Sequence, residues 1–337
     1  MNRKFNFGSF FSKYNLLVVL AFIIVLFSIL KPGTYLSVFN FSSVLNYQSV
    51  VILLAFAVMV PIAAGHFDLS VGYNCCLMHI LSIGLVVKQH LPWGLALVIV
   101  IAIGVLVGII NGILVTVVRI DSFIATLGVG TIINALAYWY CDSKQVIGEL
   151  PKGFLAINSS IGGVVPTTIL ITLIIGIILY IIMDYLPLGR FFYFLGKNAK
   201  ASELCGISER KYTMIAFIFS GVITAIASVM LASILRVGQT SVGPDYLMNS
   251  FAGALMGSVA FKQGKVNVWG TGTAVLVIAF TVAGLQQMGA PYFVEPLFNG
   301  IMLIVAVSLA VVTERKRASK VDKERKDAIR KGMQKNG

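Results

Sequence analysis

Charged residues are scarce in this sequence. Asp, Glu, Lys and Arg account for 12% of the 337 residues, whereas 58% are hydrophobic. Soluble domains carry about 25% charged residues, so a soluble globular protein is excluded. The apolar residues form long continuous runs rather than the short alternating segments of a membrane β-barrel. Because a bilayer span needs about 20 mostly apolar residues, the sequence predicts an all-α polytopic membrane protein.

Motifs for nucleotide binding and nucleophilic catalysis are also missing. The chain contains no GxxxxGK(S/T) loop, which would cradle phosphates, and no GxSxG turn. The three histidines are scattered. The cysteines have neither disulfide nor zinc spacing, and they are Cys75, Cys76, Cys141 and Cys205. We therefore expect no metal, no cofactor and no enzymatic activity.

Carboxylates inside the apolar runs are few. A carrier driven by protons or sodium ions normally has charged residues that face the interior of its helix bundle. Asp68 is the one carboxylate at a suggestive position, and it lies at a loop. Coupling through the charges of the chain itself is therefore poorly supported, which points to a partner that supplies the energy.

The net charge of +13 has a topological explanation. Ten of the 26 Lys and Arg residues follow Thr313, and membrane proteins concentrate such residues on the cytoplasmic side. Nucleic-acid binding is therefore not expected. The first apolar run should be retained as a helix, because Lys31, Pro32 and Gly33 follow it instead of a small-residue cleavage site.

Ten spans follow from the apolar runs. They are 14–30, 44–64, 69–87, 93–118, 123–140, 167–186, 213–235, 247–261, 266–288 and 293–312. With the N-terminus inside, 21 Lys and Arg residues lie in cytoplasmic segments and 5 in external ones, as the positive-inside rule requires. The sequence thus predicts a transmembrane domain over 1–312 with both termini cytoplasmic, and a basic cytoplasmic tail over 313–337.

The polar segment 189–212 lies between two long apolar runs on the predicted cytoplasmic side. It holds five basic residues against Glu203 and Glu209. A basic segment that a membrane protein keeps in water is expected to contact a partner there. On the external side, the loop 141–166 is the longest connection. Three roles are open to this loop: it covers a pore mouth, it contacts an external partner, or it only connects two spans.

Asp68 lies in the sequence GHFDLSVG, residues 65–72. Asp and Ser at the start of an apolar run favour a capped helix start, and a gating or substrate role is the alternative. Residues 264–271, GKVNVWGT, are weakly similar to residues 65–72 and also join two apolar runs. This similarity favours an internal repeat of spans 2–5 and 7–10, a common design in transporters.

Several uncharged polar residues lie within or beside the predicted spans. They are Asn134, Gln286, Gln287 and Asn299. Such side chains commonly form hydrogen bonds between membrane helices. The alternative is that they line, together with Asp68, a path for a neutral, hydroxyl-rich solute.

Together these segments resemble the permease subunits of ribose-type ABC sugar importers, within the branched-chain amino acid/sugar permease superfamily. GHFDLSVG is similar to that family's GGIDLSVG signature, with His66 and Phe67 as replacements. Residues 111–112 (NG) and 123–128 (FIATLG) are similar to its N-G and F-I-x-T-L-G pair. The family's cytoplasmic loop pattern is matched by Gly189, Arg190, Gly196, Asn198, Ala201, Gly206 and Ile207. The likeness covers about residues 45–312.

The resemblance implies an assembly in the bacterial cytoplasmic (inner) membrane, surrounded by lipid. Two permease subunits, identical or different, would combine with two cytosolic ATPases and an external sugar-binding protein. The ATPases would carry all phosphate chemistry, and the 189–212 loop would hold a coupling helix seated on one of them. Its candidate contact residues are Gly189, Arg190, Gly196, Asn198, Ala201, Glu203, Leu204 and Gly206. One departure is Lys262-Gln263, where the family often has a Gly-Gly pair.

The main hypothesis is therefore an ABC importer permease for a monosaccharide or a similar small hydrophilic solute, driven by a separate ATPase. A secondary carrier or facilitator for a small neutral solute is one alternative. An ABC permease for branched-chain amino acids or for a furanosyl signalling molecule is another. A membrane scaffold that transports nothing is the last.

Overall fold

The computed structural model describes residues 14–262, 264–305, 307–308 and 312, and nearly all regular structure in this part is helical. The longer helices are α2 (Asn15–Leu30), α3 (Val38–Ala63), α4 (Ser70–Val87), α5 (Trp93–Thr116), α6 (Ser122–Cys141), α8 (Thr167–Asp184), α11 (Glu209–Leu235), α12 (Gly243–Met256), α13 (Val268–Gln287) and an apolar helix at Val294–Val305. The shorter elements are α7 (Lys152–Leu155), α9 (Pro187–Lys197), α10 (Ala199–Leu204) and the 3₁₀ turns η1 (Ala156–Asn158), η2 (Thr240–Val242) and η3 (Gly257–Val259). Strands β1 (Ser160–Ile161) and β2 (Val165–Pro166) form an antiparallel hairpin. The all-α prediction is confirmed.

Seven helices in the described part are long and apolar enough to cross a bilayer: α3, α4, α5, α6, α8, α11 and α13. The predicted spans 14–30 and 247–261 coincide with α2 and α12, which have 16 and 14 residues and are shorter than this. The predicted span 293–312 falls on the helix Val294–Val305 and then leaves the described residues. The chain is thus a multi-pass membrane protein, while the count of ten remains a prediction.

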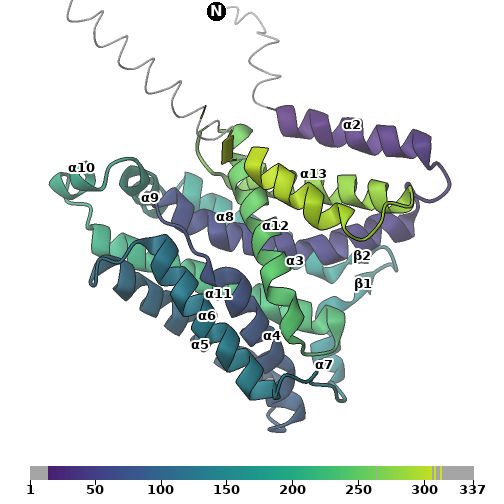
Figure 1. Ribbon diagram of the computed structural model, residues 1–337, viewed down its shortest axis with the longest axis horizontal. Helices are drawn as coiled ribbons and strands as arrows, with labels where there is room; N and C mark the ends of the chain where they lie inside the picture. Colours follow the sequence, from purple (N-terminus) through teal and green to yellow (C-terminus); the bar gives the residue numbers. More distant parts are fainter. Residues whose placement is uncertain (1–13, 263, 306, 309–311, 313–337) are drawn as a thin grey trace, which may run out of the picture.

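Helix α3 lies at the centre of the fold (Figure 1). Every residue from Val50 to Val60 is buried, whichever side of the helix it occupies. A helix that is apolar all round belongs in a core, and α3 accordingly packs against α8, α11, α12 and α13. The first turns of α3 are less buried than this stretch, and several of their side chains line a cavity.

Close backbone contact joins α5 to α11. A Cβ on Gly104 would overlap the carbonyl oxygen of Gly221, and a Cβ on Gly221 would overlap that of Gly104. Small residues permit such contact between membrane helices. Helix α11 packs against α4 and α5, while α3 packs against α12 and α13. The first helix of each half, α3 or α11, thus packs against the second and third helices of the other half. This agrees with an internal repeat of spans 2–5 and 7–10, which stays a prediction.

The long connection between α6 and α8 is folded. It carries α7, η1 and the β1–β2 hairpin. Val146 and Gly238 exchange two backbone hydrogen bonds of 2.9 Å, and the Ser233 hydroxyl donates to the Phe154 carbonyl at 3.0 Å. The loop 141–166 is therefore anchored to α11 and to the chain that follows it. Its contact with an external partner stays a prediction.

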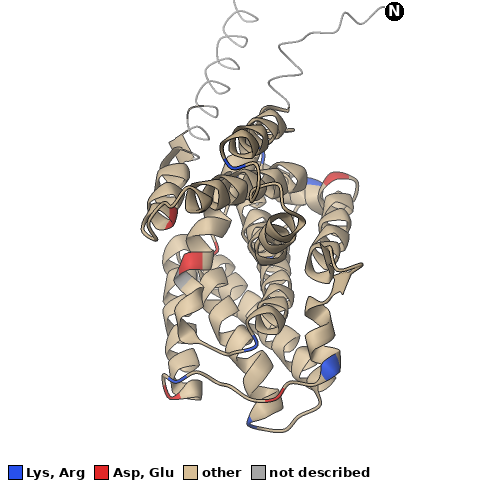
Figure 2. Ribbon diagram, turned by 90° about the vertical axis from the view of Figure 1, so that its right-hand side faces the viewer, with Lys and Arg blue, Asp and Glu red and all other residues tan. Residues whose placement is uncertain are grey.

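The molecule has two distinct ends. Figure 1 shows α10 at one edge and the β1–β2 hairpin at the opposite edge. Seen from the hairpin end, charged positions are sparse and lie mostly in loops and at helix ends (Figure 2). Helix α3 runs between the two ends, so the same helix can take part in a site at each of them. The predicted tail 313–337 lies outside the described residues.

Candidate functional site

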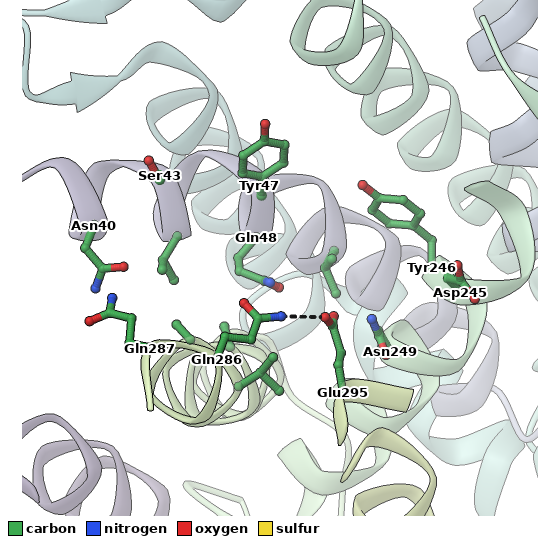
Figure 3. A pocket seen from close by; sticks show the side chains of 15 residues that line it. Asn40, Ser43, Tyr47, Gln48, Asp245, Tyr246, Asn249, Gln286, Gln287 and Glu295 are labelled. Atoms are coloured by element: carbon green, nitrogen blue, oxygen red, sulfur yellow. Dashed lines mark hydrogen bonds between the residues drawn. The ribbon is translucent and has the colours of Figure 1, made fainter. Parts of the chain in front are cut away.

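A polar cavity of about 630 Å³ opens between α3, α12, α13 and the first turn of the helix Val294–Val305 (Figure 3). Ten of the 15 residues that line it have polar side chains, and these are Asn40, Ser43, Tyr47, Gln48, Asp245, Tyr246, Asn249, Gln286, Gln287 and Glu295. A second cavity of about 420 Å³ shares Asp245, Asn249 and Glu295 with the first and extends to Asn299. A cavity rich in amides, hydroxyls and carboxylates can replace the water around a hydroxyl-rich solute.

Hydrogen bonds hold part of this wall in place. The Gln286 side-chain amide donates to Glu295 at 2.9 Å and so ties α13 to the last helix (Figure 3). The Thr34 hydroxyl donates to the side-chain oxygen Oε1 of Gln287 at 2.9 Å. Gln286, Gln287 and Asn299, for which a solute path is the alternative to hydrogen bonding between helices, are thus brought together at the two cavities.

Two other residues predicted on the path lie elsewhere. Asn134 is half-buried on α6 and does not line either cavity. Asp68 lies between α3 and α4, beyond the opposite end of α3 from the cavity. A transport role for these two residues stays a prediction, and the cavity gives it no support.

Asp68 is the centre of a buried polar network. Its Oδ1 accepts hydrogen bonds from the Ser70 amide at 3.1 Å and the Ser70 hydroxyl at 2.5 Å, and its Oδ2 accepts from the Ser220 hydroxyl at 2.7 Å. The Asn111 amide donates to the Ser70 hydroxyl at 2.9 Å. Burial raises the pKa of Asp68, and the hydrogen bonds from Ser70 and Ser220 oppose this rise. The carboxylate therefore joins the start of α4 to α5 and α11.

Helix α9 lies against the ends of several membrane helices. Gly189 is buried, and a Cβ there would overlap the carbonyl oxygen of Met183 at the end of α8. Gly196 packs in the same way against Ala63 at the end of α3. The Tyr193 hydroxyl donates to the Val266 carbonyl at 2.8 Å, just before α13. The segment 189–212 therefore begins with a helix that touches α3, α8 and the approach to α13.

Helix α10 protrudes beyond α9 (Figure 1). Asn198 caps it, since its side-chain oxygen accepts from the Ala201 amide at 3.0 Å. Gly206 follows with φ +80°, a left-handed conformation that favours glycine. Leu204 is 91% exposed, and Glu203 is exposed beside it. Asn198 and Gly206 thus shape the element, whereas Glu203 and Leu204 are available for contact.

Arg190 and Ala201 are exposed as well. One guanidinium nitrogen of Arg190 donates to the Tyr185 carbonyl at 3.4 Å, so this side chain returns toward the end of α8. Nearby, Arg119 forms an ion pair of 2.9 Å with Glu209 at the start of α11. Burial lowers the pKa of His66, which lies beside Thr213 of α11, and the charges of Glu209 and Asp121 oppose this.

Comparison with known families shows which family the chain belongs to. A family model described as "Branched-chain amino acid transport system / permease component" matches residues 40–307. The chain belongs to this family of permeases. The match spans both the cavity and the α9–α10 segment, and it confirms the superfamily that the sequence motifs resemble.

Individual relatives of this permease are named for the transport of D-allose, ribose and autoinducer 2. It is 27% identical to the D-allose transport system permease protein AlsC of Escherichia coli, over 91% of this chain and 94% of that protein. It is 28% identical to the ribose import permease protein RbsC of Haemophilus influenzae, over 90% and 94%. It is 24% identical to the autoinducer 2 import system permease protein LsrD of Photorhabdus temperata, over 88% and 90%. No solved structure matches the chain.

Sequence reasoning missed several residues of the permease cavity. Asp245 lies just outside the predicted eighth span, which began at 247, whereas Glu295 lies inside the predicted tenth span and was passed over. Helix α12 in fact begins at Gly243, which places Asp245 in its first turn. The spacing of Asp245 and Asn249, one helical turn apart, is the signal that could have found them.

Proposed function

We propose that this chain is the permease subunit of an ABC importer for a monosaccharide or a similar small, hydroxyl-rich solute. The observation that carries the proposal is the similarity to ribose and D-allose import permeases over about nine-tenths of the chain. The polar cavity at the end of α3 remote from α9 supplies a place for such a solute.

The chemistry of the cavity favours a sugar over an amino acid. A free amino acid carries a carboxylate, and the two cavities have no Lys, Arg or His among their described lining residues to neutralise it. They offer two carboxylates instead. Hydroxyl groups of a sugar can donate to these oxygens and accept from Asn and Gln side chains.

We assign energy coupling to α10 and the residues around it. In this proposal α10 inserts into a cytosolic ATPase, which binds and hydrolyses ATP on a separate chain. Closure of the ATPases displaces α10 and α9 together. Helix α9 touches the ends of α3 and α8 and the approach to α13, and the far ends of α3 and α13 line the cavity. A rigid movement of α9 is therefore transmitted to the solute site.

The proposal includes the full topology. Ten spans, both termini in the cytoplasm and a bacterial inner-membrane location put α9 and α10 inside the cell and the cavity toward the outside. A second permease subunit, a pair of ATPases and an external binding protein complete the assembly. The external protein delivers the solute to the cavity end, where the folded loop 141–166 also lies.

Reconstitution tests the proposal. The chain is co-purified with its native partners and placed in liposomes that contain ATP, and uptake of labelled D-ribose and D-allose is measured. Uptake that needs both ATP and the binding protein is expected. Uptake by the chain alone on an ion gradient would instead establish a secondary carrier.

A further inference from the structure

The two cavities are acidic. Asp245 and Glu295 line both of them, and no described basic residue does so. This contrasts with a chain whose net charge is +13. Figure 3 shows Glu295 between Gln286 and Asn249, at the centre of the polar wall. A solute that enters this space therefore meets two negative charges and no positive one from the described residues.

Neither carboxylate has a cationic partner within the described residues. The ion pairs found there join Arg119 to Glu209 and Lys262 to Asp184. Glu295 accepts one hydrogen bond, from Gln286. No group of three His, Cys, Asp or Glu side chains suited to a metal ion occurs in the described part of the chain. No cationic side chain of the described residues therefore competes with a solute for these two carboxylates.

Asn299 gives independent evidence that a hydrogen-bond donor is missing from the second cavity. Its side chain is only 6% exposed, and its carbonyl oxygen has no hydrogen-bond partner among the described residues. It lines the second cavity beside Glu295. A buried acceptor without a donor is costly, so this oxygen is suited to a group that a solute brings with it.

We infer that the cavity prefers a sugar that carries a protonated amine and rejects anionic sugars. The inference rests on the proposed function, because it treats the cavity as part of the solute path. A neutral sugar can donate hydroxyl groups to Asn299 and the carboxylates but leaves both charges uncompensated. An ammonium group donates three hydrogen bonds and neutralises one charge. A sugar phosphate or a uronate adds a third negative charge and is repelled.

Charged thiol reagents test the cavity without knowledge of the solute. Ser43 lines the cavity, and Ser43→Cys introduces a thiol there with little change in size. Ser160→Cys, on the exposed β1 strand at the same end of the molecule, is the matched reference. Both are made with Cys205→Ser, since Cys205 is the exposed native thiol and Cys75, Cys76 and Cys141 are buried.

The rates of a cationic and an anionic methanethiosulfonate are then compared in the purified, folded chain. We expect the cation-to-anion rate ratio in the Ser43→Cys variant to exceed that of the reference by roughly tenfold, because two nearby carboxylates act in a partly enclosed space. Adding Asp245→Asn and Glu295→Gln should bring the ratio down to the reference value. Equal ratios in the two single-thiol variants overturn the inference. So does a Ser43→Cys variant that reacts with neither reagent, since no solute could then reach the cavity.

Protection by sugars tests the preferred class. D-glucosamine, D-glucose and D-glucuronate are each added before the uncharged reagent methyl methanethiosulfonate. We expect D-glucosamine to slow the reaction of the Ser43→Cys thiol at the lowest concentration and D-glucuronate to have no effect. Equal protection by D-glucose and D-glucosamine, or none by any of the three, overturns the preference. These measurements need no ATP, so their failure is distinct from a failure of ATP-driven uptake.

Discussion

Gly196 at the end of α9 packs directly against the carbonyl oxygen of Ala63 at the end of α3. Gly65, with φ +89°, also packs against Gly196. The element that we propose to receive work from an ATPase is therefore in backbone contact with a helix that lines the solute cavity. Any side chain at position 196 has to separate them.

Gly196→Ala should uncouple transport. Its Cβ would overlap the Ala63 carbonyl oxygen, and overpacking of this kind costs about 1–3 kcal/mol. ATP-driven uptake should fall about tenfold, while the chain still inserts into the membrane. Gly128→Ala on α6 is the control, because nothing lies within 4 Å of a Cβ there. Equal uptake by the two variants would remove the mechanical role of this contact.

Leu204→Ala should weaken the binding of the ATPase to this chain. Leu204 is 91% exposed on α10, and a buried leucine at an interface stabilises a complex by about 1.5–3 kcal/mol. Less ATPase should co-purify with the variant, and uptake should fall in parallel. Ile161→Ala, which truncates an exposed side chain on the β1–β2 hairpin, should leave the amount of co-purified ATPase unchanged. Loss of the ATPase in both variants would point to general misfolding.

The helices and the polar segment 189–212 could be foreseen because lipid imposes simple rules on the sequence. Apolar runs marked the helices, and the polar stretch from Gly189 marked α9 and α10. The boundary between these two was also readable, since Asn198 is a good N-cap residue. These features depend on residues that are close together in the chain.

The cavity and the Asp68 network could not be foreseen in the same way. Asn40, Asp245 and Glu295 come from three separate elements, and only their packing brings them together. Asp68 and Ser220 are 152 residues apart. The sequence around Asp68 indicates a helix start, but it contains nothing that identifies a partner on α11.

The Asp68 network should be a structural unit rather than part of the solute path. In Asp68→Asn one oxygen is replaced by a donor, so either Ser70 or Ser220 faces an NH₂ group. The cost should be about 1–3 kcal/mol in the free energy of unfolding. Ser220→Ala removes one of these partners. The double variant should therefore be more stable than the sum of the two single effects predicts, as thermal unfolding in detergent can measure. Strict additivity would mean that the two side chains do not interact.

Gly221→Ala should destabilise the contact between α5 and α11 without touching either functional end. A Cβ there would overlap the Gly104 carbonyl oxygen, so the helices must separate. We expect a loss of about 1–3 kcal/mol and a lower Tm in detergent. Gly300→Ala, where a Cβ meets nothing within 4 Å, should leave the Tm unchanged. A similar fall in both variants would indicate a general intolerance of alanine.

Asn249→Leu should slow transport through the cavity. Asn249 lines both cavities on α12, and the substitution keeps the size of the side chain while it removes the amide. One hydrogen bond to a solute contributes about 0.5–1.5 kcal/mol, so uptake of labelled D-ribose or D-allose should slow roughly two- to tenfold. Asn134→Leu is the matched control: the same change on α6, at a residue that lines neither cavity. Its uptake should equal that of the parent chain. If Asn134→Leu slows uptake and Asn249→Leu does not, the solute path follows α6 instead of the cavity between α3, α12 and α13.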